Sequence, residues 1–140
     1  MKIIMTKGLP ASGKTTWAKQ YLKDNPKTKR VNKDELRAML DDEIWSQENE
    51  DFVLKIRNLI IKQAIMEGYD ILVDDTNLAP KHEKVLRFIA KDRGADFEVK
   101  DFTDVEPITC IERDMEREHP VGEEVIWRMF GTFMKAKNEK

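Results

Sequence analysis

The feature that most constrains this chain is a glycine-containing segment near its start, Gly8-Leu9-Pro10-Ala11-Ser12-Gly13-Lys14-Thr15. It matches the pattern G-x-x-x-x-G-K-[ST] at every fixed position. It lies between an apolar run, Lys2 to Thr6, that predicts a strand, and a segment, Lys14 to Leu22, that predicts a helix. In such a loop the glycines let backbone N–H groups turn toward a phosphate, and the helix N-terminus adds partial positive charge. The motif therefore predicts a P-loop that binds a nucleoside triphosphate.

The mechanism of a P-loop assigns contacts to the residues around it. Lys14 is expected to reach the β and γ phosphates, and the hydroxyl of Thr15 to hold Mg²⁺. The expected nucleotide is ATP or another NTP. The predicted ATP-binding residues, which include two arginines discussed below, are Gly8, Pro10, Ala11, Ser12, Gly13, Lys14, Thr15, Thr16, Arg113 and Arg117.

Strand and helix patterns alternate along the rest of the chain. Further strands are predicted over 29–32, 69–73 and 95–102, and helices over 33–40, 52–68, 80–94 and from 107 to the end, with a break near His119 to Gly122. This order predicts a parallel sheet with right-handed crossovers, with ligands outside the carboxyl ends of its strands. We expect an α/β fold: a P-loop NTPase-type three-layer sandwich with a parallel sheet of about four strands and a helical lid over about residues 110–123.

Composition limits the class of protein further. A chain of 140 residues that is 40% hydrophobic fits a single domain over 1–140 and excludes a disordered tail. The one cysteine, Cys110, cannot form a bridge within the chain, and the N-terminus MKIIMTKG lacks the apolar region of a secretory signal. No apolar run approaches the roughly 20 residues that cross a bilayer. These features predict an intracellular, cytoplasmic protein with no membrane partner, and they leave the oligomeric state open.

Two acids follow the third predicted strand, Asp74 and Asp75. In P-loop enzymes an acid at the end of an apolar strand helps to hold the magnesium ion. We therefore expect the metal site to include Thr15, Asp74 and Asp75. Which of the two aspartates contacts the metal shell is left open.

Asp34 and Arg37 follow the second predicted strand at the start of a helix, three positions apart and hence on one face. A carboxylate there could accept a proton from an attacking hydroxyl, and the arginine could grip an anionic acceptor. The alternative is a helix-capping acid beside a surface arginine.

Arg113 and Arg117 are four residues apart on a predicted helix that ends at a Pro and Gly break. An arginine delivered by a mobile segment is a recurrent way to stabilise a transferring phosphoryl group. The alternative is a pair of surface arginines near Glu112 and Glu116.

Charge and aromatic residues give weaker signals. Residues 1–37 carry a net charge of +7, whereas the whole chain carries -2, and this favours a polyanionic partner near the P-loop. The acidic stretch from Asp41 to Asp51 is expected to be a solvated connection. The larger aromatic side chains are expected in the core more than as stacking partners for bases: Trp17, Trp45, Trp127, Phe130 and Phe133.

Four segments, in this order, resemble the kinase domain of the bacteriophage type of 5′-polynucleotide kinase: G-L-P-A-S-G-K-T-T-W, V-N-K-D-E-L-R, V-D-D-T-N-L and E-R-D-M-E-R. The resemblance implies transfer of the γ-phosphate of ATP, with Mg²⁺, to the 5′-hydroxyl end of DNA or RNA. It implies that the catalytic residues are Lys14, Asp34 as general base, Arg37 and the lid arginine Arg117. The acceptor-binding residues that it implies are Asp34, Arg37, Asp75, Thr76 and Asn77.

One departure and two alternatives accompany this resemblance. Many relatives continue into a 3′-phosphatase domain, whereas this chain stops at Lys140, so repair of 3′ ends is not expected. One alternative is a P-loop kinase of a small hydroxyl metabolite or antibiotic, and the other is a non-catalytic, ATP-regulated binding module. Asp34 and Arg37 argue against the module, because a switch needs no base for an acceptor hydroxyl. The basic N-terminal third favours a polynucleotide over a neutral sugar.

Overall fold

The structure, a computed structural model, describes residues 1–134. Four strands and six helices follow one another in the order that the sequence predicts. They are β1 (Lys2–Lys7), α1 (Lys14–Asp24), β2 (Thr28–Val31), α2 (Lys33–Asp41), α3 (Gln47–Met66), β3 (Asp70–Val73), α4 (Pro80–Arg93), β4 (Asp96–Asp101), α5 (Pro107–Met115) and α6 (Glu123–Phe133).

The four strands form one parallel sheet in the order β2-β3-β1-β4. The central strands β1 and β3 are nearly continuous apolar runs, because both of their faces are covered. β4 pairs with β1 and forms an edge of the sheet, and most of its side chains are exposed. The parallel sheet of about four strands is thereby confirmed.

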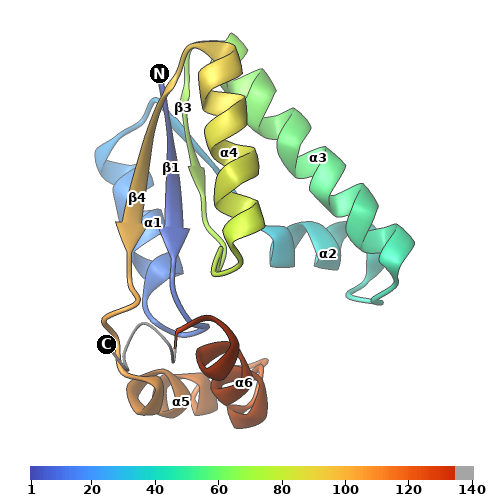
Figure 1. The fold of residues 1–140 in the computed structure, drawn as a ribbon, viewed down its shortest axis with the longest axis vertical. Helices are drawn as coiled ribbons and strands as arrows, with labels where there is room; N and C mark the ends of the chain where they lie inside the picture. Colours follow the sequence, from blue (N-terminus) through green and yellow to red (C-terminus); the bar gives the residue numbers. More distant parts are fainter. Residues whose placement is uncertain (135–140) are drawn as a thin grey trace.

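Helices cover both faces of the sheet, as Figure 1 shows. Ile4 points to the face of α1, where it packs with Ala18 and Leu72. Ile3 and Met5 point to the opposite face and join the main core under α3 and α4. This alternation confirms the three-layer α/β sandwich, and it brings the carboxyl ends of β1, β2 and β3 to one edge.

Side chains at the helix starts explain where α2 and α3 begin. The Oδ1 atom of Asn32 accepts a hydrogen bond from the backbone N–H of Glu35 at 2.9 Å. The hydroxyl of Ser46 accepts one from the backbone N–H of Asn49 at 3.0 Å. Both are N-caps, which satisfy N–H groups that the helix leaves unpaired. Since Asn32 follows β2 directly, the first turn of α2 lies at the carboxyl edge of the sheet.

Helices α5 and α6 lie beyond the carboxyl ends of β1 and β4 (Figure 1). They share a small core of their own, in which Cys110, Ile111 and Ile126 surround Leu9. Leu9 belongs to the predicted P-loop and is 1% exposed. The loop is therefore anchored to the α5–α6 pair by apolar packing.

Two expectations about the helices need correction, and a third extends beyond the described residues. Helix α3 begins at Gln47 rather than near residue 52, so the acidic stretch 41–51 is only partly a connection and its second half forms the first helical turn. Helix α5 ends at Met115, and α6 begins at Glu123. The break is wider than predicted because it begins three residues before His119, and Arg117 lies within it rather than on a helix. The predicted helix to the end of the chain includes residues 135–140, which lie outside the described residues.

The core prediction for the aromatic side chains is wrong for three of them. Trp45 is 70% exposed, Trp127 is 40% exposed and Phe133 is 41% exposed. Trp45 lies in the connection between α2 and α3, where no helical face directs a side chain inward. Trp17 and Phe130 do pack against buried clusters, as predicted. Separately, no helix within residues 1–134 combines the length and the apolar character needed to span a bilayer.

Candidate active site

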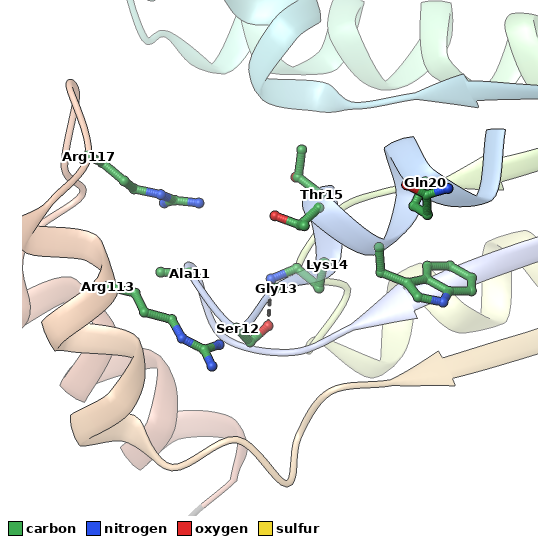
Figure 2. Close-up of a pocket in the computed structure, with 10 residues that line it drawn as sticks. Ala11, Ser12, Gly13, Lys14, Thr15, Gln20, Arg113 and Arg117 are labelled. Atoms are coloured by element: carbon green, nitrogen blue, oxygen red, sulfur yellow. Dashed lines mark hydrogen bonds between the residues drawn. The ribbon is translucent and has the colours of Figure 1, made fainter. Parts of the chain in front are cut away.

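The P-loop curls around its own lysine. Ala11 and Gly13 adopt left-handed backbone conformations, with φ of 63° and 102°, which turn the chain into α1. The Lys14 Nζ atom donates to the backbone oxygen of Leu9 at 2.5 Å and to the Ser12 hydroxyl at 3.3 Å, the second of which is drawn in Figure 2. Without a ligand, the Lys14 ammonium donates to acceptors of its own loop. A bound phosphate would take the place of these acceptors as the partner of the lysine.

Lys14 is 7% exposed, and burial lowers its pKa to about 8. The nearby Asp74 carboxylate opposes this shift, because a negative neighbour favours the charged ammonium. Phosphate groups beside the lysine would act in the same sense. The site is therefore built to regain a full positive charge when an anion enters.

A cavity of about 740 Å³, here called the large cavity, opens beside the P-loop. Its lining residues are Ala11, Ser12, Gly13, Lys14, Thr15, Thr16, Trp17, Gln20, Arg113 and Arg117. Figure 2 shows the two arginines reaching toward the loop from the α5 side. Although Arg117 is not on the helix, both arginines border the same space, as the sequence predicts.

A second cavity of about 200 Å³, the small cavity, adjoins the P-loop lysine. It is lined by Pro10, Lys14, Thr15, Asn32, Lys33, Asp34, Arg37, Asp74, Asp75, Thr76, Arg117, Val121 and Met129. A third hollow of about 490 Å³, the outer groove, lies over α2 and the break that contains Arg117. Thr15 and Arg117 border all three spaces, so the P-loop and the first turn of α2 face one connected cleft.

The two aspartates after β3 have different partners. Asp74 Oδ2 accepts from the Thr15 hydroxyl at 3.0 Å and from Arg30 Nε at 2.9 Å. Asp75 Oδ1 accepts from the backbone N–H of Lys33 at 2.9 Å. Burial raises the pKa of Asp75 to about 6, although Lys33 and other cations oppose the shift. Asp75 thus links the end of β3 to the start of α2, while Asp74 lies against the P-loop threonine.

The arrangement around Asp74 fits a magnesium ion. Asp74 Oδ1 is buried without a hydrogen-bond partner, next to the carboxylate oxygen that contacts Thr15. Within residues 1–134 no group of three or more His, Cys, Asp or Glu side chains could hold a metal. Mg²⁺ is commonly held by one or two protein oxygens together with waters and substrate phosphates, so a cage of carboxylates is not required.

The predicted pair on α2 is in contact. The Arg37 Nη1 atom donates to Asp34 Oδ1 at 2.7 Å. Its Nε and Nη2 atoms donate to the two carboxylate oxygens of Glu50 at 2.8 and 2.7 Å. These bonds raise the pKa of Arg37. Glu50 on α3 therefore fixes the guanidinium that Asp34 touches. No pattern in the sequence predicts this contact, because Glu50 lies in the acidic stretch that is expected to be solvated.

The break between α5 and α6 is fastened by a buried carboxylate. Asp114 is 2% exposed, and its two oxygens accept from the backbone N–H groups of Val121 at 3.0 Å and Gly122 at 2.9 Å. Arg117 Nη1 lies 3.4 Å from the same carboxylate. The segment that carries Arg117 is thus closed into a loop at the end of α5.

Two predicted site residues do not line these spaces. Gly8 lies beneath the loop, where its N–H bonds to the backbone oxygen of Thr76. Asn77 is 2% exposed, and its amide donates to the backbone oxygen of Thr6 at 2.9 Å. Sequence reasoning also missed Arg30, whose guanidinium pairs with Asp74 at 2.8 Å. Its position at the carboxyl end of β2 was the available signal.

Comparisons with known proteins agree with this geometry. The model of a family described as "AAA domain" (AAA_33) matches residues 3–135. A curated relative, the L-seryl-tRNA(Sec) kinase of Methanococcus maripaludis, is 30% identical over 136 residues, which are 95% of this chain and 52% of the relative. The chain thus spans about half the length of that protein.

Solved structures share the fold. A chain of the Pnkp1/Rnl/Hen1 RNA repair complex superposes with a TM-score of 0.84 at 22% identity, covering 99% of this chain and 46% of that one. The Mycobacterium tuberculosis APS kinase CysC, in complex with AMPPNP and APS, gives a TM-score of 0.65 at 22% identity, covering 82% and 69%. A gluconokinase from Sinorhizobium meliloti gives 0.66 at 13% identity, covering 99% and 78%.

The family match covers nearly the whole chain, and the neighbours with this fold include kinases of several kinds. Together with a P-loop that faces a lined cavity, these findings identify the chain as a member of the AAA domain family with the fold of a P-loop kinase.

Proposed function

We propose that the protein transfers the γ-phosphate of ATP to the 5′-hydroxyl end of a DNA or RNA strand. The observation that carries the proposal is the composition of the small cavity. Lys14 and Thr15 of the P-loop line the same 200 Å³ space as Asp34 and Arg37 of α2. A phosphate donor and a hydroxyl acceptor held by these two pairs would meet there, which is what direct transfer requires.

The proposed reaction is an in-line displacement at the γ-phosphorus. The acceptor hydroxyl oxygen forms the new P–O bond, the bond to the β–γ bridging oxygen breaks, and ADP leaves with that electron pair. Asp34, which lines the small cavity and whose side chain is 84% exposed, takes the hydroxyl proton. Lys14 and Arg117 stabilise negative charge on the transferring group and on the leaving oxygen. Thr15 and Asp74 would hold Mg²⁺, whose positive charge would help to offset the negative charge of the phosphates.

Support for a polynucleotide acceptor comes from two sources. Arg37 presents a planar guanidinium, held in place by Glu50, at the mouth of the small cavity, and such a group suits a phosphate of the acceptor strand. One relative is named as a kinase of a seryl-tRNA, and one structural neighbour belongs to an RNA repair complex. The APS kinase and gluconokinase neighbours keep a small-molecule acceptor as the second candidate.

The test is a transfer assay with γ-labelled ATP and Mg²⁺. Acceptors are 5′-hydroxyl DNA and RNA oligonucleotides, nucleosides with and without a 3′-phosphate, gluconate and adenosine phosphosulfate. We expect label on the oligonucleotides and on the nucleoside 3′-phosphates. Label on a small metabolite alone would replace the polynucleotide acceptor by the second candidate, and no label on any acceptor would contradict kinase activity on this panel.

Two variants separate the proposed roles. Asp34→Asn keeps the shape of the side chain but cannot take a proton, so the rate should fall roughly 10²-fold or more with ATP affinity little changed. Arg37→Ala should raise the KM of the 3′-phosphorylated nucleoside and remove its advantage over the plain nucleoside, while slow ATP hydrolysis persists. Arg37→Lys should restore only part of that advantage, because lysine lacks the planar fork. Arg93→Ala, at the end of α4, serves as the matched control for loss of an arginine.

A further inference from the structure

The large cavity extends past the phosphate-binding loop along α1. Its volume of about 740 Å³ lies within the roughly 300–1,000 Å³ of small-molecule sites. Lys14 and Thr15 mark the phosphate end of the cavity, and Trp17 and Gln20 line it one and two turns into α1. No role assigned so far uses these two side chains. A nucleoside attached to the α phosphate has room beside them.

Trp17 is an indole held from several sides. Its ring lies 5.2 Å from the ring of Tyr21 and 6.1 Å, edge to face, from that of Phe102. It also packs against the buried cluster of Ile4, Ala18 and Leu72, and it is only half-buried. An aromatic surface that is already fixed loses little freedom when a base stacks on it. The Lys100 Nζ atom lies over the ring, 5.4 Å from its centroid, so one face of the indole carries a positive charge and a base stacks on the other face or displaces the lysine.

Gln20 is exposed on α1, and its amide has a hydrogen-bond partner on the same helix. Its Nε2 atom donates to Asp24 at 3.2 Å from Oδ1 and 3.4 Å from Oδ2, one turn further along α1. Figure 2 shows the side chain on the same helix as Thr15, beyond it along α1. Since the amide nitrogen is engaged by the carboxylate, the amide offers its oxygen to a ligand. An acceptor oxygen pairs with the exocyclic amine of adenine but not with the O6 oxygen of guanine.

We propose that Trp17 and Gln20 form the subsite for the base of the donor nucleotide, in which an adenine stacks on the indole and its amine bonds to Gln20. The subsite rests on the donor half of the proposed function and adds to it a preference for adenine over guanine. Trp17 and Gln20 lie further along α1 than Lys14 and Thr15, the α1 residues assigned to phosphoryl transfer and to Mg²⁺.

Calorimetric titration with Mg²⁺ and three ligands tests the stacking contact: ADP, GDP and tripolyphosphate. Trp17→Ala should weaken ADP binding about tenfold or more and leave tripolyphosphate binding unchanged, because stacking contributes only when a base is present. Trp17→Phe should keep most of the ADP affinity. Unchanged tripolyphosphate binding also shows that the variant retains its fold. Trp45→Ala removes an exposed indole that lies outside the cavity and is the matched control.

The same titrations test the choice of base. Wild-type protein should bind ADP about tenfold more tightly than GDP, and Gln20→Ala should bring the ratio near one. Asp24→Ala should also lower the ratio, since the freed amide can rotate to serve either base. The subsite would be overturned if the ratio of ADP to GDP affinity stayed the same in Gln20→Ala and Asp24→Ala. It would also be overturned if Trp17→Ala lost affinity for ADP and tripolyphosphate equally.

The outcome is distinguishable from failure of the proposed function. If wild-type protein binds ADP with the expected dependence on Trp17 yet labels no acceptor, the subsite stands and the kinase activity fails. If label reaches an acceptor and Trp17→Ala binds ADP normally, the subsite fails alone. Protein that binds neither ADP nor tripolyphosphate would contradict both.

Discussion

At the residue scale, three charged groups of the cleft already have hydrogen-bond partners within the protein. Lys14 donates within its own loop, Arg37 bridges Asp34 and Glu50, and Asp74 accepts from Thr15. A ligand therefore exchanges existing hydrogen bonds for new ones, and the net gain is smaller than the number of contacts suggests. These exchanges can be measured as proton uptake when ADP binds and as changes of kcat and KM in variants.

The depressed pKa of Lys14 predicts that nucleotide binding takes up a proton. Without ligand the lysine titrates at about 8, and phosphates beside it raise the pKa because they favour the charged form. Below pH about 8 both states carry the proton, so ADP affinity should stay constant. Above it, affinity should fall by up to tenfold per pH unit until the pKa of the complex is reached.

Calorimetry at pH about 9 in buffers of different ionisation enthalpy measures this uptake directly, and close to one proton per ADP is expected. Lys14→Met should bind ADP weakly and lose the dependence on buffer. If the ADP affinity of the wild-type protein stays constant between pH about 7.5 and 10, Lys14 does not take up a proton on binding.

The two arginines of the large cavity should differ in effect. Arg117 also borders the small cavity and the outer groove, where transfer is proposed, whereas Arg113 borders the large cavity alone. Arg117→Ala should therefore lower kcat roughly 10²-fold or more, by analogy with arginines that stabilise transferring phosphoryl groups. Arg113→Ala should be milder and act mainly on the KM of ATP. Steady-state kinetics of both variants tests this difference. A larger loss of kcat in Arg113→Ala than in Arg117→Ala would place the transferring phosphate nearer Arg113.

At the scale of elements, the position of the α5–α6 pair, which includes the predicted lid, is set by two anchors. Leu9 inserts from the P-loop into the core of the pair, and Asp114 fastens the break between the helices. The pair is therefore joined to the phosphate-binding loop by packing and closed on itself by hydrogen bonds. Any movement of the lid over a nucleotide must keep or break these specific contacts.

Removing the Asp114 carboxylate should loosen the lid. Asp114→Ala leaves the N–H groups of Val121 and Gly122 without their partner, at a cost of about 2–4 kcal/mol in the free energy of unfolding. The kcat should fall as well, since Arg117 loses the loop that positions it. Asp114→Asn keeps one acceptor oxygen, so its free energy of unfolding and its kcat should lie between those of the wild-type protein and Asp114→Ala. Glu112→Ala, on the exposed face of α5, is the control for urea unfolding, and equal effects of both alanine variants would argue against the anchor.

At the scale of the whole molecule, the P-loop depends on a close approach between β1 and β4. A Cβ added to Gly8 would lie 2.9 Å from the Cβ of Phe102 and 2.9 Å from the Ser12 hydroxyl oxygen. Gly8→Ala should therefore lower the free energy of unfolding by about 1–3 kcal/mol and weaken ADP binding, because the loop must shift.

Gly131→Ala is the matched substitution for Gly8→Ala. Its Cβ would meet nothing within 4 Å, and the residue lies inside α6. The change should be neutral or stabilise the protein by up to about 1 kcal/mol, because alanine favours helix. Thermal unfolding and ADP titration of both variants check the pair. Wild-type behaviour of Gly8→Ala would mean that the strand ends separate easily.

The sequence predicted the layers, the strand order along the chain and the P-loop because these follow from local patterns: apolar runs, glycines and caps. It did not predict Glu50 as the partner of Arg37, because the two residues are 13 positions apart on different helices and Glu50 lies in a stretch rich in acids. It predicted Arg117 on a helix because neither Glu116 nor Arg117 disfavours a helix. In the structure α5 ends at Met115, and a hydrogen bond from the backbone N–H of Val121 to the buried Asp114 carboxylate holds the following segment in a loop. Asn77 was misplaced for a similar reason, since a polar residue after β3 could serve either the cleft or the backbone of β1.

The exposed edge strand β4 has a further consequence, for solubility. A strand that pairs on one side presents a row of backbone groups to which another chain can add, and this is a starting point for aggregation. In β4 the residues Asp96, Glu98, Lys100 and Asp101 are all charged and exposed. Charges on an edge repel an incoming strand, so these residues act as gatekeepers against aggregation. Apolar replacements at Glu98 and Lys100 should leave the chain folded but lower the protein concentration at which aggregation begins.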